Sequence, residues 1–90
     1  MTREEAQRHF DLFARAAVLP DGLRWLWADH VVGDLGVGND LFSGSGDTML
    51  RVGVGFLWDE LDAMTPEDVA VLFRVRVLNA KKALDAFYPV

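Results

Sequence analysis

The sequence predicts an all-α fold, a compact bundle of about four helices built by one domain over residues 1–90. Three observations lead to this expectation. Ninety residues suffice for one modest core. Hydrophobic residues make up 51% of the chain, which is too apolar for a disordered protein. Apolar residues recur at helical spacing near both ends of the chain.

The first helix is expected to begin after Thr2 and to end at the turn Leu19–Gly22. Thr2 and Glu5 have the spacing of a capping box, in which a hydroxyl and a carboxylate satisfy early backbone amides. One apolar stripe follows at helical intervals: Phe10, Phe13, Ala14, Ala17 and Val18. Proline followed by Asp-Gly then favours a turn.

A second helix is expected from about Leu23 to Asp34, with apolar residues on two sides, as in a helix buried between neighbours. Trp25 and Trp27 would then point in different directions, because two positions along a helix correspond to roughly 200°. A glycine-rich loop is expected over residues 35–47. Loops of this length in so small a domain are often functional.

The segment TMLRVGVGFLWDELDAM, residues 48–64, permits two interpretations. A helix capped by Asp47 or Thr48 would explain the whole segment, although each interior glycine costs about 1 kcal/mol relative to alanine. A strand would explain the alternation of large and small residues but only as far as Leu57. The helix is preferred. The alternative is an α+β fold with one short strand or hairpin near residues 49–57.

The last helix has a clear predicted start. Thr65 suits the N-cap, Pro66 the first helical position, and Glu67 and Asp68 the positive end of the helix dipole. Apolar residues then recur at helical spacing, interrupted by Arg76, and Pro89 marks the expected stop.

The net charge of −5 is concentrated in the middle of the chain. Residues 21–68 hold ten acids: Asp21, Asp29, Asp34, Asp40, Asp47, Asp59, Glu60, Asp62, Glu67 and Asp68. An acidic middle repels phosphate backbones, so direct nucleic-acid binding is not expected. The remaining route to nucleic acid is the C-terminal cations Arg74, Arg76, Lys81 and Lys82.

Several chemistries lack the residues they need. The chain has no cysteine, which removes disulfides, thiolate nucleophiles and thiolate metal sites. None of the Gly-x-Gly pairs has the third glycine of a dinucleotide fingerprint, and no lysine precedes Lys81, which excludes a P-loop. His9 and His30 lack metal-ligand spacing. We therefore expect no catalytic residue, no metal, no cofactor and no enzyme.

The location that this composition favours is the cytoplasm. A cysteine-free chain is compatible with a reducing compartment. The first ten residues are charged, unlike a secretory signal, and no apolar run is long enough for a membrane span.

The leading functional expectation is a small acidic protein that binds another protein with a basic surface, as an inhibitor, adaptor or regulatory subunit. The candidate partner-binding residues combine an aromatic anchor with carboxylates that attract the partner: Trp25, Asp59, Glu60, Asp62, Glu67 and Asp68. One specific form is nucleic-acid mimicry. Phage-encoded antagonists of bacterial defence offer an analogy of size and charge only.

Three further options remain open at this stage. The glycine-rich loop 36–47, near His30, could bind a small molecule or an anion. The C-terminal cations could bind DNA. A homodimer could form through an apolar or tryptophan-bearing face.

Overall fold

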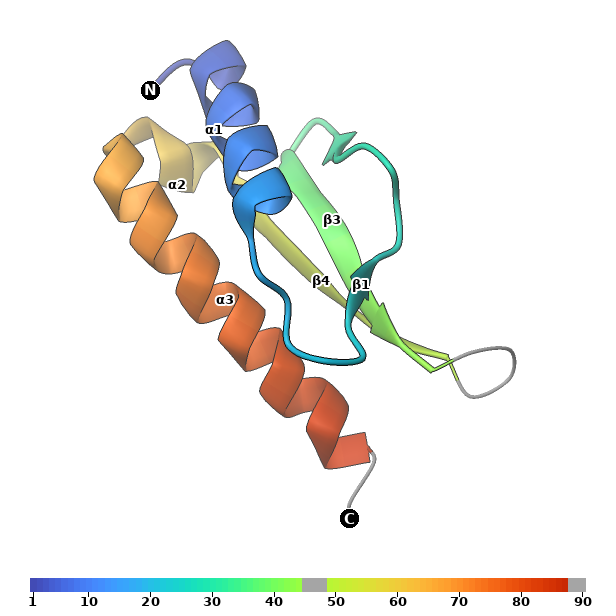
Figure 1. The fold of residues 1–90 in the computed structure, drawn as a ribbon. Helices are drawn as coiled ribbons and strands as arrows, with labels where there is room; N and C mark the ends of the chain where they lie inside the picture. Colours follow the sequence, from blue (N-terminus) through green and yellow to red (C-terminus); the bar gives the residue numbers. More distant parts are fainter. Residues whose placement is uncertain (45–48, 88–90) are drawn as a thin grey trace.

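The computed structural model of the chain describes residues 1–44 and 49–87 and is α+β (Figure 1). Within these residues it has three helices and a four-stranded antiparallel sheet. The elements in order are α1 (Arg3–Ala16), β1 (Arg24–Trp25), β2 (Val31–Val32), β3 (Gly36–Ser43), β4 (Leu50–Leu57), α2 (Trp58–Asp62) and α3 (Pro66–Phe87). The expected all-α helical bundle is therefore wrong. The alternative, an α+β fold with one short strand or hairpin near residues 49–57, has the right class, but the observed sheet has four strands.

The sheet is organised around β3. Strand β4 pairs with one edge of β3 along its whole length, from the pair Gly36–Leu57 to the pair Ser43–Leu50. The short strands β1 and β2 both pair with the other edge, also antiparallel. They behave as one interrupted strand, so the chain forms an antiparallel meander before it enters α2 and α3 (Figure 1).

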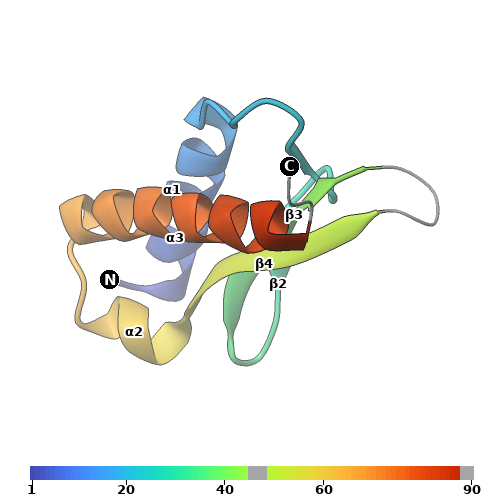
Figure 2. The ribbon, with the colours of Figure 1, turned by 90° about the horizontal axis from the view of Figure 1, so that it is seen from below.

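The β3–β4 hairpin has two different faces, because successive side chains in a strand point to opposite sides. The inner face carries Val37, Asn39 and Leu41 from β3 and Val52, Val54 and Phe56 from β4. The outer face carries Gly36, Gly38, Asp40 and Phe42 from β3 and Arg51, Gly53, Gly55 and Leu57 from β4. Helices α1 and α3 cover the inner face (Figure 2).

The core is centred on three aromatic rings from three elements. Phe10 of α1 lies edge-on to Phe73 of α3 with ring centroids 5.4 Å apart, and edge-on to Phe56 of β4 at 6.2 Å. All three side chains are at least 96% buried. Edge-to-face packing adds to the free energy gained by burying these large rings, so this cluster joins both long helices to the hairpin.

The predicted starts of the first and last helices are confirmed. The hydroxyl of Thr2 accepts a hydrogen bond from the Glu5 amide at the start of α1 (3.2 Å). At the start of α3, Thr65 and Asp68 exchange reciprocal side chain–backbone hydrogen bonds. Val18 was expected in the apolar stripe of the first helix. It lies after α1 has ended and is 95% exposed, so that part of the prediction is wrong.

The predicted helix over Leu23–Asp34 is wrong, because this segment pairs with β3 instead. The buried side chain of Asn39 fixes this segment in place. Its amide group accepts a hydrogen bond from the Trp27 backbone N–H (3.2 Å) and donates one to the Trp27 carbonyl (3.1 Å). These bonds satisfy backbone groups between β1 and β2 that a helix would otherwise pair internally. Local helical spacing could not reveal a partner that lies twelve residues away.

The predicted glycine-rich loop and the predicted helix over residues 48–64 are also wrong. Residues 36–43 and 50–57 are the two strands of the hairpin, and a helix begins only at Trp58. Gly38 and Gly55 are direct cross-strand partners, so two of the Gly-x-Gly motifs belong to one structural feature. The expected helix cap at Asp47 or Thr48, the last residues of the expected glycine-rich loop and the expected stop at Pro89 lie outside the described residues.

Candidate functional site

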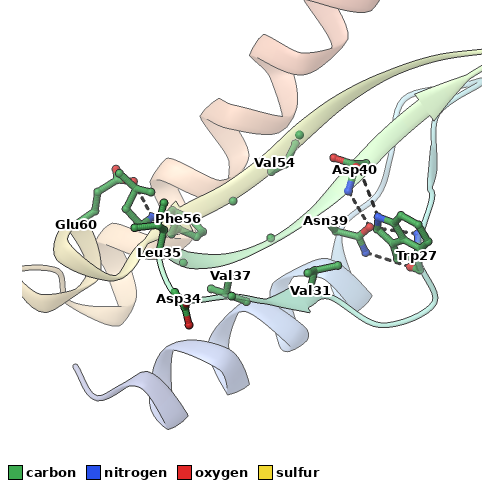
Figure 3. Close-up of a pocket in the computed structure, with 16 residues that line it drawn as sticks. Trp27, Val31, Asp34, Leu35, Val37, Asn39, Asp40, Val54, Phe56 and Glu60 are labelled. Carbon is green, nitrogen blue, oxygen red and sulfur yellow. Dashed lines mark hydrogen bonds between the residues drawn. The ribbon is translucent and has the colours of Figure 1, made fainter.

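An open groove of about 850 Å³ lies over the outer face of the hairpin (Figure 3). Its floor contains four glycines, Gly36 and Gly38 from β3 and Gly53 and Gly55 from β4. Because glycine has no side chain, the floor is largely strand backbone. An incoming group can therefore approach the sheet more closely here than over any other residue type.

Three of these glycines are required by the pairing of the strands themselves. A Cβ atom added at Gly36, Gly55 or Gly38 would lie 2.0, 2.6 or 2.8 Å from a carbonyl oxygen of the opposite strand. No real Cβ atom tolerates such contacts. At Gly53 the nearest atom to an added Cβ would be Asp40 Oδ1, the end of a side chain, at 3.4 Å. Gly53 is thus the one floor position where a side chain fits without moving backbone.

Trp27 forms one rim of the groove and is 46% exposed. Its indole Nε1–H donates to Asp40 Oδ2 at 3.3 Å, so the ring is oriented by a residue of the floor strand (Figure 3). Asn39, which is 93% buried, makes two hydrogen bonds to the Trp27 backbone. An exposed indole held at both its backbone and its ring nitrogen loses little conformational entropy when it contacts a partner.

Three more apolar side chains lie at the rim. Val31 is 54% exposed, Leu35 is 79% exposed and Leu57 is 52% exposed, and all three line the groove; Figure 3 shows Val31 and Leu35. Leu35 is tied to the start of α2, because its carbonyl accepts from the Trp58 amide at 2.8 Å. Exposed apolar side chains gathered around one concave surface are typical of a binding site rather than of ordinary protein surface.

The charged residues that line the groove are all acidic: Asp34, Asp40 and Glu60. No lysine, arginine or histidine is among the described residues of its lining. Asp34 and Asp40 at the groove therefore favour a cationic ligand over an anion. This arrangement weakens the expectation of an anion site in the glycine-rich segment.

Glu60 is paired with Arg76 of α3. The hydrogen bond from Arg76 and the one from the Leu57 amide (2.9 Å) lower the pKa of the Glu60 carboxyl below its ordinary value, and partial burial opposes this shift. The Arg76 guanidinium also donates to the Gly55 carbonyl and lies 4.9 Å from the centroid of the Phe56 ring. Arg76 interrupts the apolar stripe of α3 because it binds this edge of the sheet.

The strand pairing of β4 explains why backbone groups of Gly55 and Leu57 need hydrogen-bond partners other than β3. The Trp58 amide donates to Leu35, so the alternation of an antiparallel ladder directs the amides and carbonyls of Gly55 and Leu57 away from β3. Arg76 donates a hydrogen bond to the Gly55 carbonyl, and Glu60 accepts one from the Leu57 amide. This ion pair joins one of the C-terminal cations to an acid of the middle segment.

The structure separates the two tryptophans that were considered as anchors. Trp25 is half-buried: its Nε1–H donates to the Ala14 carbonyl at 3.2 Å and its ring lies 6.1 Å from that of Phe73. Trp27 is the more exposed of the two and lines the groove. Sequence reasoning named Trp25 as the anchor under the assumption of a helix. In such a helix Trp25 and Trp27 lie on different sides, and the sequence does not show which of the two sides faces the core.

The predicted acidic residues lie together on α2 and the first turn of α3. Asp59, Asp62, Glu67 and Asp68 are exposed, whereas Glu60 is half-buried and alone among these five lines the groove. Sequence reasoning did not select Asn39, Asp40 or Leu57. The signal that could have found them is the match between the two Gly-x-Gly segments, which indicates a hairpin with one bare face.

The remaining candidate groups are already engaged or scattered. Lys81 forms an ion pair with Asp85 (2.6 Å), and Arg76 is bound to Glu60, which leaves Arg74 and Lys82 for a DNA contact. Among residues 1–44 and 49–87, no three histidine or carboxylate side chains gather as metal ligands. Within the same residues, no helix is both long and apolar enough to cross a bilayer.

Comparisons with known proteins do not assign the chain to a family. No protein-family model matches the chain, and no curated protein or solved structure matches it.

Proposed function

We propose that the chain is a non-enzymatic protein-binding module of the cytoplasm, acting as an inhibitor, adaptor or regulatory subunit. Its groove receives a segment of a partner protein that carries both apolar and basic side chains. One observation carries the proposal: a bare glycine floor lies beside an exposed, doubly fixed Trp27, within a lining whose charges are all acidic.

The apolar part of the contact provides the affinity. A side chain or backbone stretch laid on Gly38, Gly53 and Gly55 would contact strand backbone directly, and Trp27 would cover one side of it. Tryptophan is among the residues that most often dominate binding energy, typically with contributions of about 2 kcal/mol or more. In this proposal Trp27 takes the anchor role that the sequence had assigned to Trp25.

The acidic part of the contact determines which partner binds. Asp34 and Asp40 border the groove, and the exposed carboxylates Asp59 and Asp62 lie on the adjacent helix α2. Such a distribution accelerates association with a basic segment and disfavours acidic ones. Nucleic-acid mimicry is the narrower form of the proposal, in which the exposed acids of α2 and α3, rather than the groove, make the main contact.

The proposal is tested by selecting peptides from a random displayed library on the immobilised protein. We expect enriched peptides to combine Lys or Arg with large apolar residues. They should shift the backbone NMR signals of residues 36–40 and 53–57. A Gly53→Leu variant fills the groove at the position that tolerates a side chain and should lower affinity at least tenfold. Leu12→Ala, which changes an exposed leucine of α1 outside the groove lining, is the matched control.

Three results would overturn or narrow the proposal. If no peptide is enriched, or if Gly53→Leu binds as tightly as the unmodified chain, the groove is not the site. If charge reversal at Asp59 and Asp62 abolishes binding while Gly53→Leu has no effect, mimicry by the helical acids replaces it. Circular dichroism of each variant confirms that the fold is retained.

A further inference from the structure

Helix α3 has a second apolar row on the side that faces away from the sheet. Its inner row, which includes Val69, Phe73 and Val77, is buried against the core. Val71, Val75 and Leu78 lie on the opposite side, at spacings of four and three residues, and are 62%, 43% and 50% exposed. Each of the two rows thus repeats every three or four residues, as expected when both sides of a helix are packed.

The fold of one chain does not account for this outer row. Valine is a poor helix former, because its branched Cβ restricts the side chain against the preceding turn. Burial compensates for this at Val69 and Val77. It does not do so at Val71 and Val75, where a polar residue would suit both the helix and the solvent. A partner that covers the row would supply the missing burial.

The charges beside the row indicate which partner fits. Glu67 and Asp68 are exposed at the N-terminal end of α3, and Lys82 is exposed near its C-terminal end. Position 82 continues the outer row, since it follows Leu78 by four residues. Two copies of α3 aligned in parallel would place like charges together, whereas two antiparallel copies would place acids opposite lysines.

We propose that the chain forms a weak homodimer in which α3 packs antiparallel against α3 of a second copy. A two-fold axis between Arg74 and Val75 sets Val71 of one copy opposite Leu78 of the other. The same axis sets Glu67 opposite Lys82. Both relations occur twice in the dimer, as a self-complementary two-fold interface requires.

This surface is independent of the groove. The groove lies on the outer face of the hairpin. Helix α3 covers the inner face (Figure 2), and its outer row lies on the side of the helix opposite its buried row. A dimer through α3 would leave both grooves open on opposite sides of the assembly. Two linked grooves could engage a partner that presents two binding segments, with an increase in avidity.

The limited size of the row predicts a weak association. Three apolar side chains per copy fall far short of a standard interface of about 20–30 residues a side, so we expect a dissociation constant on the order of 10–100 µM. Arg74 flanks the row at its centre, where its long side chain can direct the guanidinium into solvent.

Sedimentation equilibrium between about 5 and 500 µM chain tests the proposal directly. We expect a monomer–dimer equilibrium that Val75→Gln weakens at least tenfold. This variant should fold, because glutamine is a better helix former than valine at an exposed position. Gly53→Leu, which alters the groove, is the matched control and should leave the equilibrium unchanged.

A charge exchange tests the antiparallel orientation. Glu67→Lys and Lys82→Glu should each weaken the dimer about threefold or more, and the double variant should restore it. A chain that remains monomeric at all concentrations would overturn the proposal. So would a dimer that is insensitive to Val75→Gln, or a double variant that adds the two single losses. Circular dichroism and thermal unfolding of each variant exclude misfolding as the cause.

Discussion

The two faces of the β3–β4 hairpin are made by alternating residues of the same two strands, yet they are constrained by different physical effects. The inner face is filled with Val37, Leu41, Val54 and Phe56, each at least 97% buried under α1 and α3. The outer face carries four glycines, Gly36, Gly38, Gly53 and Gly55, which leave strand backbone bare between exposed side chains. Removing atoms from the inner face costs stability, whereas at Gly36, Gly38 and Gly55 of the outer face adding a side chain costs stability.

This contrast teaches that the glycines serve the fold first and the groove second. Gly36, Gly38 and Gly55 allow the strands to approach closely, and the open groove follows from their missing side chains. Among the four glycines of the groove floor, Gly53 alone is not held to glycine by a backbone contact. A binding surface can therefore arise on a small domain from a steric requirement of strand pairing.

The largest expected effect comes from truncating the inner face. Phe56→Ala should lower the free energy of unfolding by about 3–5 kcal/mol, because it leaves a cavity among the rings of Phe10 and Phe73. Its neighbour Leu57 points to the outer face and is 52% exposed, so Leu57→Ala should cost less than about 1 kcal/mol. Urea unfolding of both variants measures the difference, and equal losses would contradict the two-face description.

The next effect comes from enlarging the outer face. Gly55→Ala should destabilise the chain by about 2–3 kcal/mol, because its Cβ would lie 2.6 Å from the Val37 carbonyl oxygen. Gly53→Ala, two residues earlier on the same face, is the matched control. It should be neutral or stabilise by up to about 1 kcal/mol, because alanine loses less backbone entropy on folding. Thermal unfolding of the Gly55→Ala and Gly53→Ala variants measures both effects. Equal losses of stability would show that the Cβ contact at Gly55 is not what requires glycine there.

A smaller, pH-dependent effect comes from the ion pair at the edge of the hairpin. Because hydrogen bonds lower the pKa of Glu60 in the folded chain, the unfolded state binds a proton at higher pH than the folded state does. The resulting stabilisation is complete above the ordinary glutamate pKa, declines as the pH falls through the folded pKa, and is absent below both.

Arg76→Met should remove about 1–2 kcal/mol at neutral pH through loss of charge-assisted hydrogen bonds. The methionine retains packing against Phe56, so the change isolates the polar contacts. The difference in unfolding free energy between this variant and the unmodified chain should shrink as the pH is lowered from about 7 to 3. A difference that does not vary with pH would show that Glu60 is not its source.

The smallest expected effect on stability concerns Trp27. Trp27→Phe removes the exposed hydrogen bond to Asp40 and should change the free energy of unfolding by less than about 1 kcal/mol. The same variant should weaken peptide binding in the groove, because it removes indole area from the rim. If Trp27→Phe unfolds the chain, Trp27 belongs to the structural core and cannot serve as a free anchor.

Sequence reasoning succeeded where the signal was local. The start of α1 at Thr2 and the start of α3 at Thr65 depend on side chains three residues away, and both are confirmed. It failed where the partner was remote. Gly38 and Gly55 are seventeen positions apart, so each Gly-x-Gly segment was interpreted alone, one as a loop and the other as part of a helix.

The candidate site shows the same division. The acidity of the middle segment was evident from composition, and Glu60 does line the groove. The choice between Trp25 and Trp27 was not evident, because both are tryptophans in one apolar segment. The distinction arises from the buried Asn39, which holds the Trp27 backbone at the groove, and from the Ala14 carbonyl, which binds the Trp25 indole on the inner side.

The sequence by itself determined the helix caps at both ends of the chain, the acidic middle and the absence of thiol chemistry, since each depends on residue identity or on neighbours within one turn. Only the tertiary structure decided that the glycines form two paired strands and a groove. That decision depends on contacts between segments seventeen residues apart, where backbone atoms approach too closely for any residue except glycine.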